Sequence, residues 1–249
     1  MNKVFTFIAF LFIGALGYGQ YSGQIATNMS AGGADQGGTA GAIATLLGPV
    51  NDAYQKRTID WEEFQGSPYT ADEFLPAELF YRDEKVGSVF YRYNALNEEV
   101  EIKETKTQQG IRGLGRDKNI ILKIMGNPMS FKTFIDKNNR TLNGYLTQLV
   151  DGENIDLYKR TLVKFTEGQK AANSFVKDTP SRFSQFEEYY IQKKGVDRID
   201  ELLPKKSKIY KLTGPEKRPE LKEFLKDNDL DVNDEEDLKR LILYIDRQL

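Results

Sequence analysis

The stretch VFYRYNALNEEVEIK, residues 89–103, decides the fold class of this chain. Its first half places Val89, Tyr91 and Tyr93 on one side of an extended chain, and its second half alternates aliphatic with charged residues in the same way. A two-residue period carried by aromatic and β-branched side chains is typical of strands. The stretch therefore predicts a β-hairpin whose turn is formed by residues 95–98.

Further strand-like segments lie on both sides of this hairpin. Residues 77–83 are expected to pair with its first strand across a turn at residues 84–87. Asp151 with Gly152 is a strong turn signal between two later strands. The other expected elements are a central strand at 119–126, a turn at 126–128, strands at 129–135, 144–150 and 155–165, and a hairpin at 187–199 that turns at Lys194 and Gly195.

Strands that follow one another through short turns, with no helical segment between them, predict an antiparallel β meander. We expect a β-rich α+β fold in which residues 61–199 form an antiparallel β domain, either an open curved sheet or a half-barrel. The alternating strands suggest one covered face and one face in water. Residues 200–249 are expected to form a small helical C-terminal part packed on this domain.

The C-terminal part carries three helical patterns. The first two cover residues 204–214 and 219–228. The clearest covers residues 234–249, with Asn233 as its N-cap and Glu236 completing a capping box. A single apolar stripe runs along it, formed by Leu238, Leu241, Ile242, Ile245 and Leu249.

The start of the chain has the features of a secretory signal peptide. Lys3 precedes an apolar run over residues 4–16, and small residues follow, which predicts residues 1–19 as a signal peptide cleaved after Gly19. That run is shorter than the ~20 residues a membrane anchor needs, and no cysteine stands nearby to carry a lipid. Residues 20–60 are expected to be a flexible Gly/Ala-rich leader, with a tether to a partner as the functional alternative. We expect no transmembrane segment after signal removal, and a location in the periplasm, at the outer-membrane periphery or outside the cell.

The 249 residues include no histidine and no cysteine. This composition excludes Ser-His-Asp and Cys-His catalysis and ordinary zinc sites. A formal net charge of −2 at pH 7 does not favour a nucleic-acid binder, which needs a basic stripe. An enzyme would have to use carboxylates, lysine, tyrosine or an oxygen-liganded cation. We expect no enzyme, cofactor or metal, and we predict no catalytic, cofactor-binding or metal-binding residue.

Two stretches suggest ion binding. Residues 227–238 are acidic, but an EF-hand loop needs Gly at its sixth position and Glu at its twelfth, where this chain has Val232 and Leu238. A turn between two helices with an acidic cap is therefore the favoured interpretation. Residues 110–118 are rich in glycine and hold three cations that could bind phosphate or sulfate, although an ordinary loop is favoured. These cations are Arg112, Arg116 and Lys118.

Acidic and aromatic residues offer two more candidate surfaces. A carboxylate pair for glycoside hydrolysis, which needs a fixed separation across a cleft, could come from Glu98, Glu99 and Glu101 near Asp83 and Glu84. Acidic residues on the wet face of a sheet are the favoured interpretation. The aromatic residues could bind sugars or peptides, but core packing is favoured because most alternate with apolar residues. They are Trp61, Tyr91, Tyr93, Tyr145, Tyr158, Tyr189 and Tyr190.

Five stretches carry a resemblance: GSPYTADEF at 66–74, YRYNALNEEVEIK at 91–103, GYLTQLVDGENIDLYKR at 144–160, SRFSQFEEYYI at 181–191 and EDLKRLILYID at 236–246. Together they resemble an uncharacterised family of signal-peptide-bearing exported proteins of Bacteroidetes, over residues 64–249. The ending GYGQ of the signal peptide suits that group. The resemblance implies an address in the outer compartment of a Gram-negative cell and carries over no functional residue.

The leading expectation is a non-enzymatic exported envelope protein, a binding or structural module associated with the periplasm or outer membrane. Its partner would be an envelope or outer-membrane protein complex. The first alternative is a periplasmic carrier of a lipid or other hydrophobic ligand in a half-barrel, which needs an apolar concave face open to solvent. The second is a carboxylate-based polysaccharide hydrolase, which needs two carboxylates in one cleft.

Overall fold

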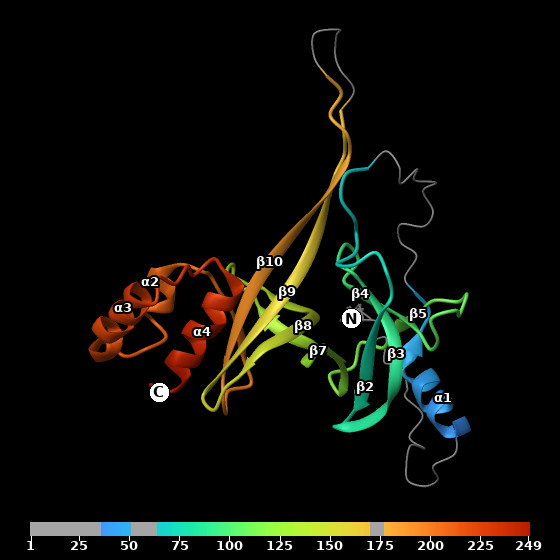
Figure 1. The fold of residues 1–249 in the computed structure, drawn as a ribbon, viewed down its shortest axis with the longest axis horizontal. Coiled ribbons are helices and arrows are strands. Elements are labelled where there is room, and N and C mark those ends of the chain that lie inside the picture. The colour runs from blue at the N-terminus through green and yellow to red at the C-terminus, as the bar shows by residue number, and fades with distance from the viewer. Residues whose placement is uncertain (1–35, 51–63, 170–176) are drawn as a thin grey trace, which may run out of the picture. The chain divides into compact units, whose positions relative to one another are not determined.

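The computed structural model describes residues 36–50, 64–169 and 177–249 (Figure 1). The expected signal peptide, Trp61 and most of the expected leader lie outside these ranges. The first elements are α1 Gln36–Thr45, β1 Leu47–Gly48, β2 Leu75–Tyr81, β3 Glu84–Asn94, β4 Glu99–Lys103, β5 Arg112–Leu114, β6 Ile120–Ile124 and β7 Asn127–Ile135. The later ones are β8 Thr141–Asp151, β9 Ile155–Thr166, β10 Arg182–Lys193, β11 Ile199–Leu202, α2 Lys206–Ile209, η2 Pro215–Lys217, α3 Arg218–Asp227 and α4 Glu235–Asp246.

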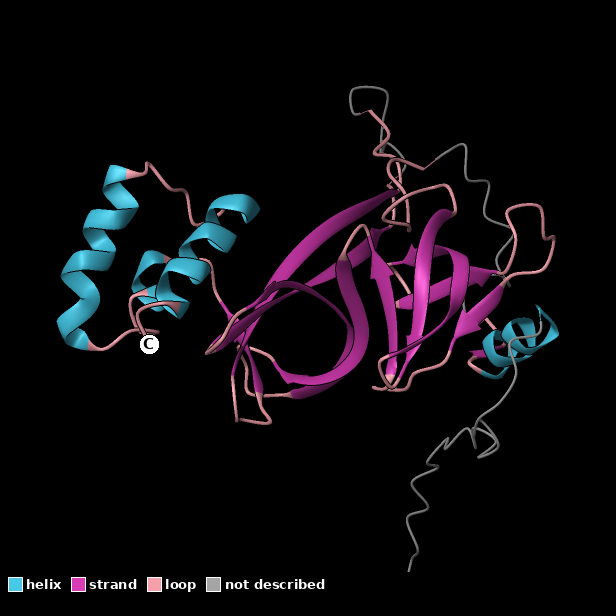
Figure 2. Cartoon of the chain, turned by 60° about the horizontal axis from the view of Figure 1, so that its bottom comes forward, coloured by secondary structure: helices cyan, strands magenta, loops and turns pink. Residues whose placement is uncertain are grey.

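The described strands form one sheet in the order β1-β5-β4-β3-β2-β6-β7-β11-β10-β9-β8. All its ladders are antiparallel except the one between β7 and β11, which is parallel and joins Ile135 to Asp200. Because β7 also pairs with β8, the strands β7 to β11 close on themselves (Figure 2), and we call them the strand ring. The expected fold class, β-rich and antiparallel with a small helical C-terminal part, is confirmed.

The hairpin that defined the fold class forms as predicted. Tyr91 pairs with Ile102 and Tyr93 pairs with Val100, between β3 and β4. All four side chains are buried, because the predicted alternation directs them to one face of the hairpin. The turn between them occupies residues 95–98, as expected.

Two other turns differ from expectation. The β2–β3 turn is Arg82 and Asp83, both with positive φ, of 50° and 68°, as a type I′ hairpin turn requires. Residues 84–87, expected to form that turn, belong to β3. The turn between β6 and β7 is formed by Met125 and Gly126, with φ of 47° and 93°. In place of a turn over 126–128, the residues from Asn127 onward already belong to β7.

Three apolar cores hold the described part together. The first lies mainly on β2–β6, includes Ile43 and Leu46 of α1 and its following turn, and extends to Val163 of β9 and Phe183 of β10. The second joins the helices to the outer face of the strand ring, at Ile155 and Leu157. The third lies inside the ring and consists of Phe134, Leu146, Tyr158, Tyr190 and Ile199.

Part of the expected leader belongs to this fold. Residues 36–48 form α1 and β1, and Ile43 and Leu46 are 4% and 1% exposed. Arg112 fixes this segment by donating from Nη2 to the carbonyl oxygens of Ala44 and Leu47, at 3.1 and 3.0 Å. The expectation of a flexible leader is therefore corrected for these residues.

The helical part needs three corrections. The first helix, expected over residues 204–214, is the short α2 alone. Asp234 rather than Asn233 caps α4, because its side chain accepts the N–H of Asp237 at 3.0 Å. Leu249 is 52% exposed and lies outside the buried stripe. Among the described residues, none of the helices is long and apolar enough to cross a bilayer.

Candidate functional site

Several polar side chains from different strands gather on the inner face of the strand ring. On β9 and β10, the pairing of Tyr158 with Tyr190 sets the even-numbered residues facing inward. On β7 the same face holds Phe134 and, two residues earlier, Lys132. The centre of the ring is filled, since the Phe134 and Tyr190 rings lie 4.6 Å apart and Leu146 is 0% exposed. Polar groups lie on either side of this aromatic centre.

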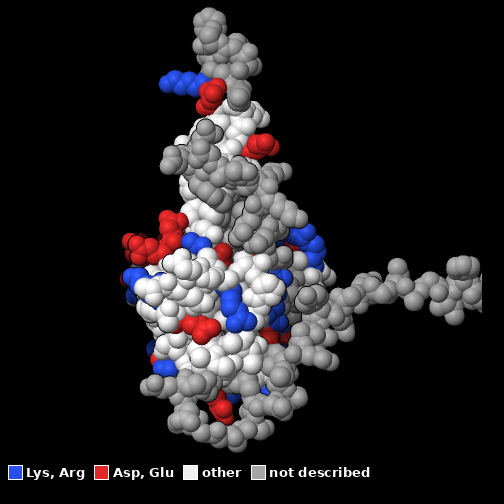
Figure 3. Space-filling view, turned by 90° about the vertical axis from the view of Figure 1, so that its right-hand side faces the viewer, with Lys and Arg blue, Asp and Glu red and all other residues white. Residues whose placement is uncertain are grey.

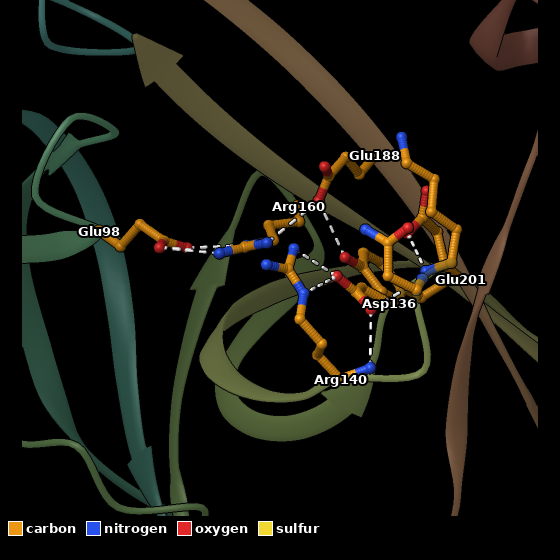
Figure 4. A network of polar contacts seen from close by, with 9 residues as sticks. Glu98, Asp136, Arg140, Arg160, Glu188 and Glu201 are labelled. Carbon is orange, nitrogen blue, oxygen red and sulfur yellow. Dashed lines mark hydrogen bonds and ion pairs between the residues drawn. The ribbon is translucent and has the colours of Figure 1, made fainter.

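Arg160 occupies one polar side (Figure 4). Its Nε and Nη2 donate to the two carboxylate oxygens of Glu98, each at 2.8 Å, and Nη1 donates to Glu188 at 3.1 Å. The Tyr190 hydroxyl donates to the same Glu188 oxygen at 2.9 Å. Burial raises the pKa of Tyr190, and Glu188 raises it further. This network ties the β3–β4 turn to the ring, since Glu98 belongs to that turn.

The turn between β7 and β8 contributes two further contacts in Figure 4. Asp136 accepts Nε of Arg140 at 2.7 Å. Glu201 of β11 accepts the backbone N–H of Lys137 at 2.6 Å. The first contact lies within the turn, and the second holds β11 beside the end of β7, where the parallel pairing between the two strands is a single residue pair.

Asp156 occupies the other polar side. It is 5% exposed and lies 2.9 Å from Nζ of Lys194 and 3.2 Å from Nε2 of Gln148. The Tyr158 hydroxyl lies 3.3 Å from Asp156 and 3.2 Å from Oε1 of Gln192. Burial raises the pKa of Tyr158, and the Asp156 carboxylate raises it further. Asp156 is thus a fully engaged acceptor.

Lys132 differs from these groups. Its Nζ lies 5.1 Å from the centre of the Tyr158 ring, in the geometry of a cation–π contact. None of the described carboxylates lies within ion-pair distance of it. The pKa of Lys132 is below the ordinary lysine value, mainly because the side chain is partly buried. The Asp156 and Asp197 carboxylates raise this pKa and Lys194 lowers it, but burial outweighs the carboxylates.

The acidic stretch at residues 227–238 forms the connection from α3 to α4. Asp231 accepts the N–H of Asn233 at 2.9 Å, and Asp234 caps α4. These carboxylates form hydrogen bonds within the turn between the two helices, in agreement with the favoured interpretation of an acidic cap. Within the described ranges, no group of three or more acidic residues is placed to hold a metal ion.

The three cations of residues 110–118 do not share one environment. Arg112 is directed to the turn between α1 and β1, where it donates to two carbonyl oxygens. Arg116 and Lys118 are exposed in the connection between β5 and β6. On the face drawn in Figure 3, Lys and Arg side chains are interspersed with Asp and Glu. Charge alone therefore distinguishes no part of that face as an anion site.

The candidate carboxylates are separately engaged. Glu98 binds Arg160, and Glu101 accepts Nε and Nη2 of Arg92 at 3.0 and 2.7 Å. Glu99 and Glu101 are only 7% and 4% exposed, which corrects the expectation that they lie on a wet face. The remaining two, Asp83 and Glu84, are exposed at the β2–β3 turn.

The segment before β2 covers the Arg92–Glu101 pair of the hairpin. The guanidinium of Arg92 stacks 3.7 Å above the ring of Tyr69 and 4.6 Å from that of Phe74. Arg92 also donates to the carbonyl oxygen of Asp72 at 3.3 Å. The aromatic residues expected in the core are buried there, namely Tyr91, Tyr93, Tyr145, Tyr158, Tyr189 and Tyr190.

One feature that sequence reasoning missed is an open stretch of strand edge on β10. β10 pairs with β9 along its whole length, but on its other side β11 pairs only from Tyr189 onward. At the opposite end, Gln65 pairs with Arg182 and accepts the N–H of Phe183 at 2.8 Å. Between these two neighbours, on the side away from β9, none of the described strands pairs with residues 184–188, and we call this side of them the free edge. Figure 1 shows this part of the β9–β10 hairpin running beyond β8.

The direction of the backbone groups on the free edge follows from its neighbours. The N–H of Phe183 points away from β9, since it donates to Gln65. Backbone groups alternate in direction along an antiparallel strand, so those of Gln185 and Glu187 also point outward. Phe186 lies between them and is 45% exposed. Nζ of Lys164 lies 4.9 Å above its ring.

Comparison of the sequence with models of known protein families, with curated proteins and with solved structures finds no match.

Proposed function

We propose that this chain is a non-enzymatic exported protein of the cell envelope that binds an extended segment of another envelope protein. The observation that carries the proposal is the free edge of β10, where an incoming strand would complete the hydrogen bonding of Gln185 and Glu187. Unpaired strand edges are the usual template for strand addition. The signal-peptide features of residues 1–19 support an envelope location.

The free edge suits a short segment. Its five residues span about 17 Å, at roughly 3.3 Å per residue, and it is bounded by Gln65 on one side and β11 on the other. Backbone pairing would supply affinity, and alternate side chains would supply specificity. Phe186 offers an apolar contact, while the Glu187 carboxylate, on a side chain 38% exposed, already lies 3.6 Å from Nζ of Lys159.

The two alternatives receive less support from the contacts. A carrier of a hydrophobic molecule needs an apolar interior with room for its ligand, but the strand ring is filled by Phe134, Leu146 and Tyr190. A carboxylate hydrolase needs two acidic groups facing one cleft. Glu98 and Glu101 are instead each bound to a different arginine.

The proposal is tested by a cross-linked pull-down from the native envelope, using the mature protein and Gln185→Pro. Proline removes the outward N–H of Gln185 and blocks strand addition, while it leaves the β9 ladder intact because that N–H takes no part in it. Gln185→Ala is the matched control, since it removes the side chain and keeps the N–H. Both variants should show the wild-type thermal transition.

We expect one envelope protein to be captured reproducibly by the wild type and by Gln185→Ala, and to be lost with Gln185→Pro. Equal capture by a folded Gln185→Pro variant would overturn strand addition at this edge. Recovery of lipid or glycan without protein would favour the alternative functions.

A further inference from the structure

The free edge presents one of its two faces as an open surface. Side chains of β9 and β10 alternate between the faces, and Val163 and Phe183 lie on the face that packs into the first core. The opposite face holds Ser184 and Phe186, with Leu162 of β9 directly across from Phe186. Phe186 is 45% exposed and Leu162 is half-buried. An incoming strand would therefore meet an apolar surface at the centre of this open face.

The two ends of the open face differ in charge. Lys164, which is the cross-strand partner of Ser184, and Arg182 lie at one end, and both are exposed. None of the described carboxylates lies within ion-pair distance of either cation. At the other end, Glu188 already lies 3.1 Å from Nη1 of Arg160. The cationic end thus lacks a counter-charge among the described residues, whereas the acidic end has one.

An antiparallel incoming strand would meet these features in a fixed order. Antiparallel pairing is slightly more stable per residue than parallel pairing, and the outward backbone groups of Gln185 and Glu187 would each exchange two hydrogen bonds with the new strand. The residue opposite Phe186 then lies on the open face, in close side-chain contact with it. The residue two positions later lies opposite Ser184 on the same face. Only the small serine side chain separates that residue from Lys164.

We propose that the free edge selects segments in which an apolar residue is followed two positions later by Asp or Glu. This inference rests on the proposed function and names the kind of segment that strand addition would take. The apolar residue packs against Phe186 and Leu162 and removes their exposed surface from water. The carboxylate approaches the ammonium of Lys164, whose Nζ lies 4.9 Å above the Phe186 ring. Arg182 adds a second cation at this end, so a basic residue in the same place would be repelled.

The test is a selection of random nine-residue peptides, displayed on phage, by the folded mature protein. Gln185→Pro identifies the binders that need the free edge. Among the peptides that this variant loses, we expect enrichment of an apolar residue followed two positions later by Asp or Glu. Lys164→Glu should abolish the acidic preference, and Phe186→Ser should abolish the apolar preference. Lys123→Glu, at an exposed lysine of β6, is the matched control and should change neither preference.

Two synthetic peptides taken from the selection, differing only in Asp or Asn at the second position, give the size of the effect. The aspartate peptide should bind the wild type about two- to fivefold more tightly, as is typical of an exposed ion pair. The ratio of the two dissociation constants should fall towards one with Lys164→Glu, and also at high salt, because salt screens the pair. Fluorescence anisotropy measures both constants.

The outcomes distinguish this inference from the proposed function. Peptides that are lost with Gln185→Pro but show no acidic preference would overturn the inference and leave strand addition intact. So would an acidic preference that persists in Lys164→Glu. If no peptide is lost with a folded Gln185→Pro variant, strand addition at this edge is wrong, and the inference is wrong with it.

Discussion

Asp246, near the end of α4, fastens the helical part to the strand ring. Its carboxylate accepts the backbone N–H groups of Glu153, Asn154 and Ile155 at 2.9, 2.7 and 2.8 Å. The side chain of Asn154 donates to the carbonyl oxygen of Asp246 at 2.9 Å. One carboxylate thus accepts the N–H groups of three successive residues at the β8–β9 turn. Asp246 is buried there, with 6% of it exposed.

Asp246→Ala should therefore be strongly destabilising. It leaves three N–H donors without their acceptor, and the expected loss of unfolding free energy is about 3 kcal/mol. Burial raises the pKa of Asp246, but the three N–H donors outweigh burial and hold that pKa below its ordinary value of 3.8. The stabilisation is therefore present above pH 3.8 and is lost as the pH falls through the lower, folded-state pKa. Urea unfolding at neutral and acidic pH measures both effects, and a loss that did not shrink at acidic pH would contradict this role.

At position 152, in the same turn, there is no room for a side chain larger than that of glycine. A Cβ at this position would lie 2.3 Å from the carbonyl oxygen of Ile155 and 2.6 Å from the Asp246 carboxylate. Gly152→Ala should therefore lower the melting temperature markedly. Gly110→Ala is the control, because a Cβ there meets nothing within 4 Å. Equal melting temperatures for the two variants would show that the turn is not closely packed against α4.

At the level of single elements, periodicity was a good guide to strands and a poor guide to turns. The β3–β4 hairpin follows directly from alternating aromatic residues. The β2–β3 turn was placed too late because its two residues with positive φ are Arg82 and Asp83, whereas glycine and asparagine are the usual signals of such a turn. Likewise, Asp234 and Asn233 are both good caps by type, and only the backbone geometry distinguishes them.

α4 is predicted to be part of the core. Leu241 is 0% exposed and lies in the cluster that joins the helices to Ile155 and Leu157. Leu241→Ala should reduce the unfolding free energy by about 3 kcal/mol, as large-to-small changes in cores do. Leu243→Ala, at a position 40% exposed on the same helix, should have little effect. Similar urea midpoints for the two variants would mean that α4 does not pack on the ring.

For the molecule as a whole, neither the closed ring nor the free edge could be predicted from local sequence patterns. Closure depends on the pairing of β7 with both β8 and β11, and the second of these is a single parallel residue pair. β9 is buried on both faces because three cores meet it, at Leu157, Tyr158 and Val163. A two-residue period predicts that a strand exists, but the partners of its edges are set by segments distant in sequence. The contact between Lys132 and the ring of Tyr158 was missed for the same reason, since it exists only in the assembled ring.

The first measurement to make is amide hydrogen exchange of the mature protein by NMR, read at the free edge. The N–H groups of Gln185 and Glu187 should exchange rapidly because they point away from β9 and pair with none of the described strands. Those of Phe186 and Glu188, directed at β9, should be protected. Equal protection at all four positions would contradict the proposal, because Gln185 and Glu187 would then already have partners.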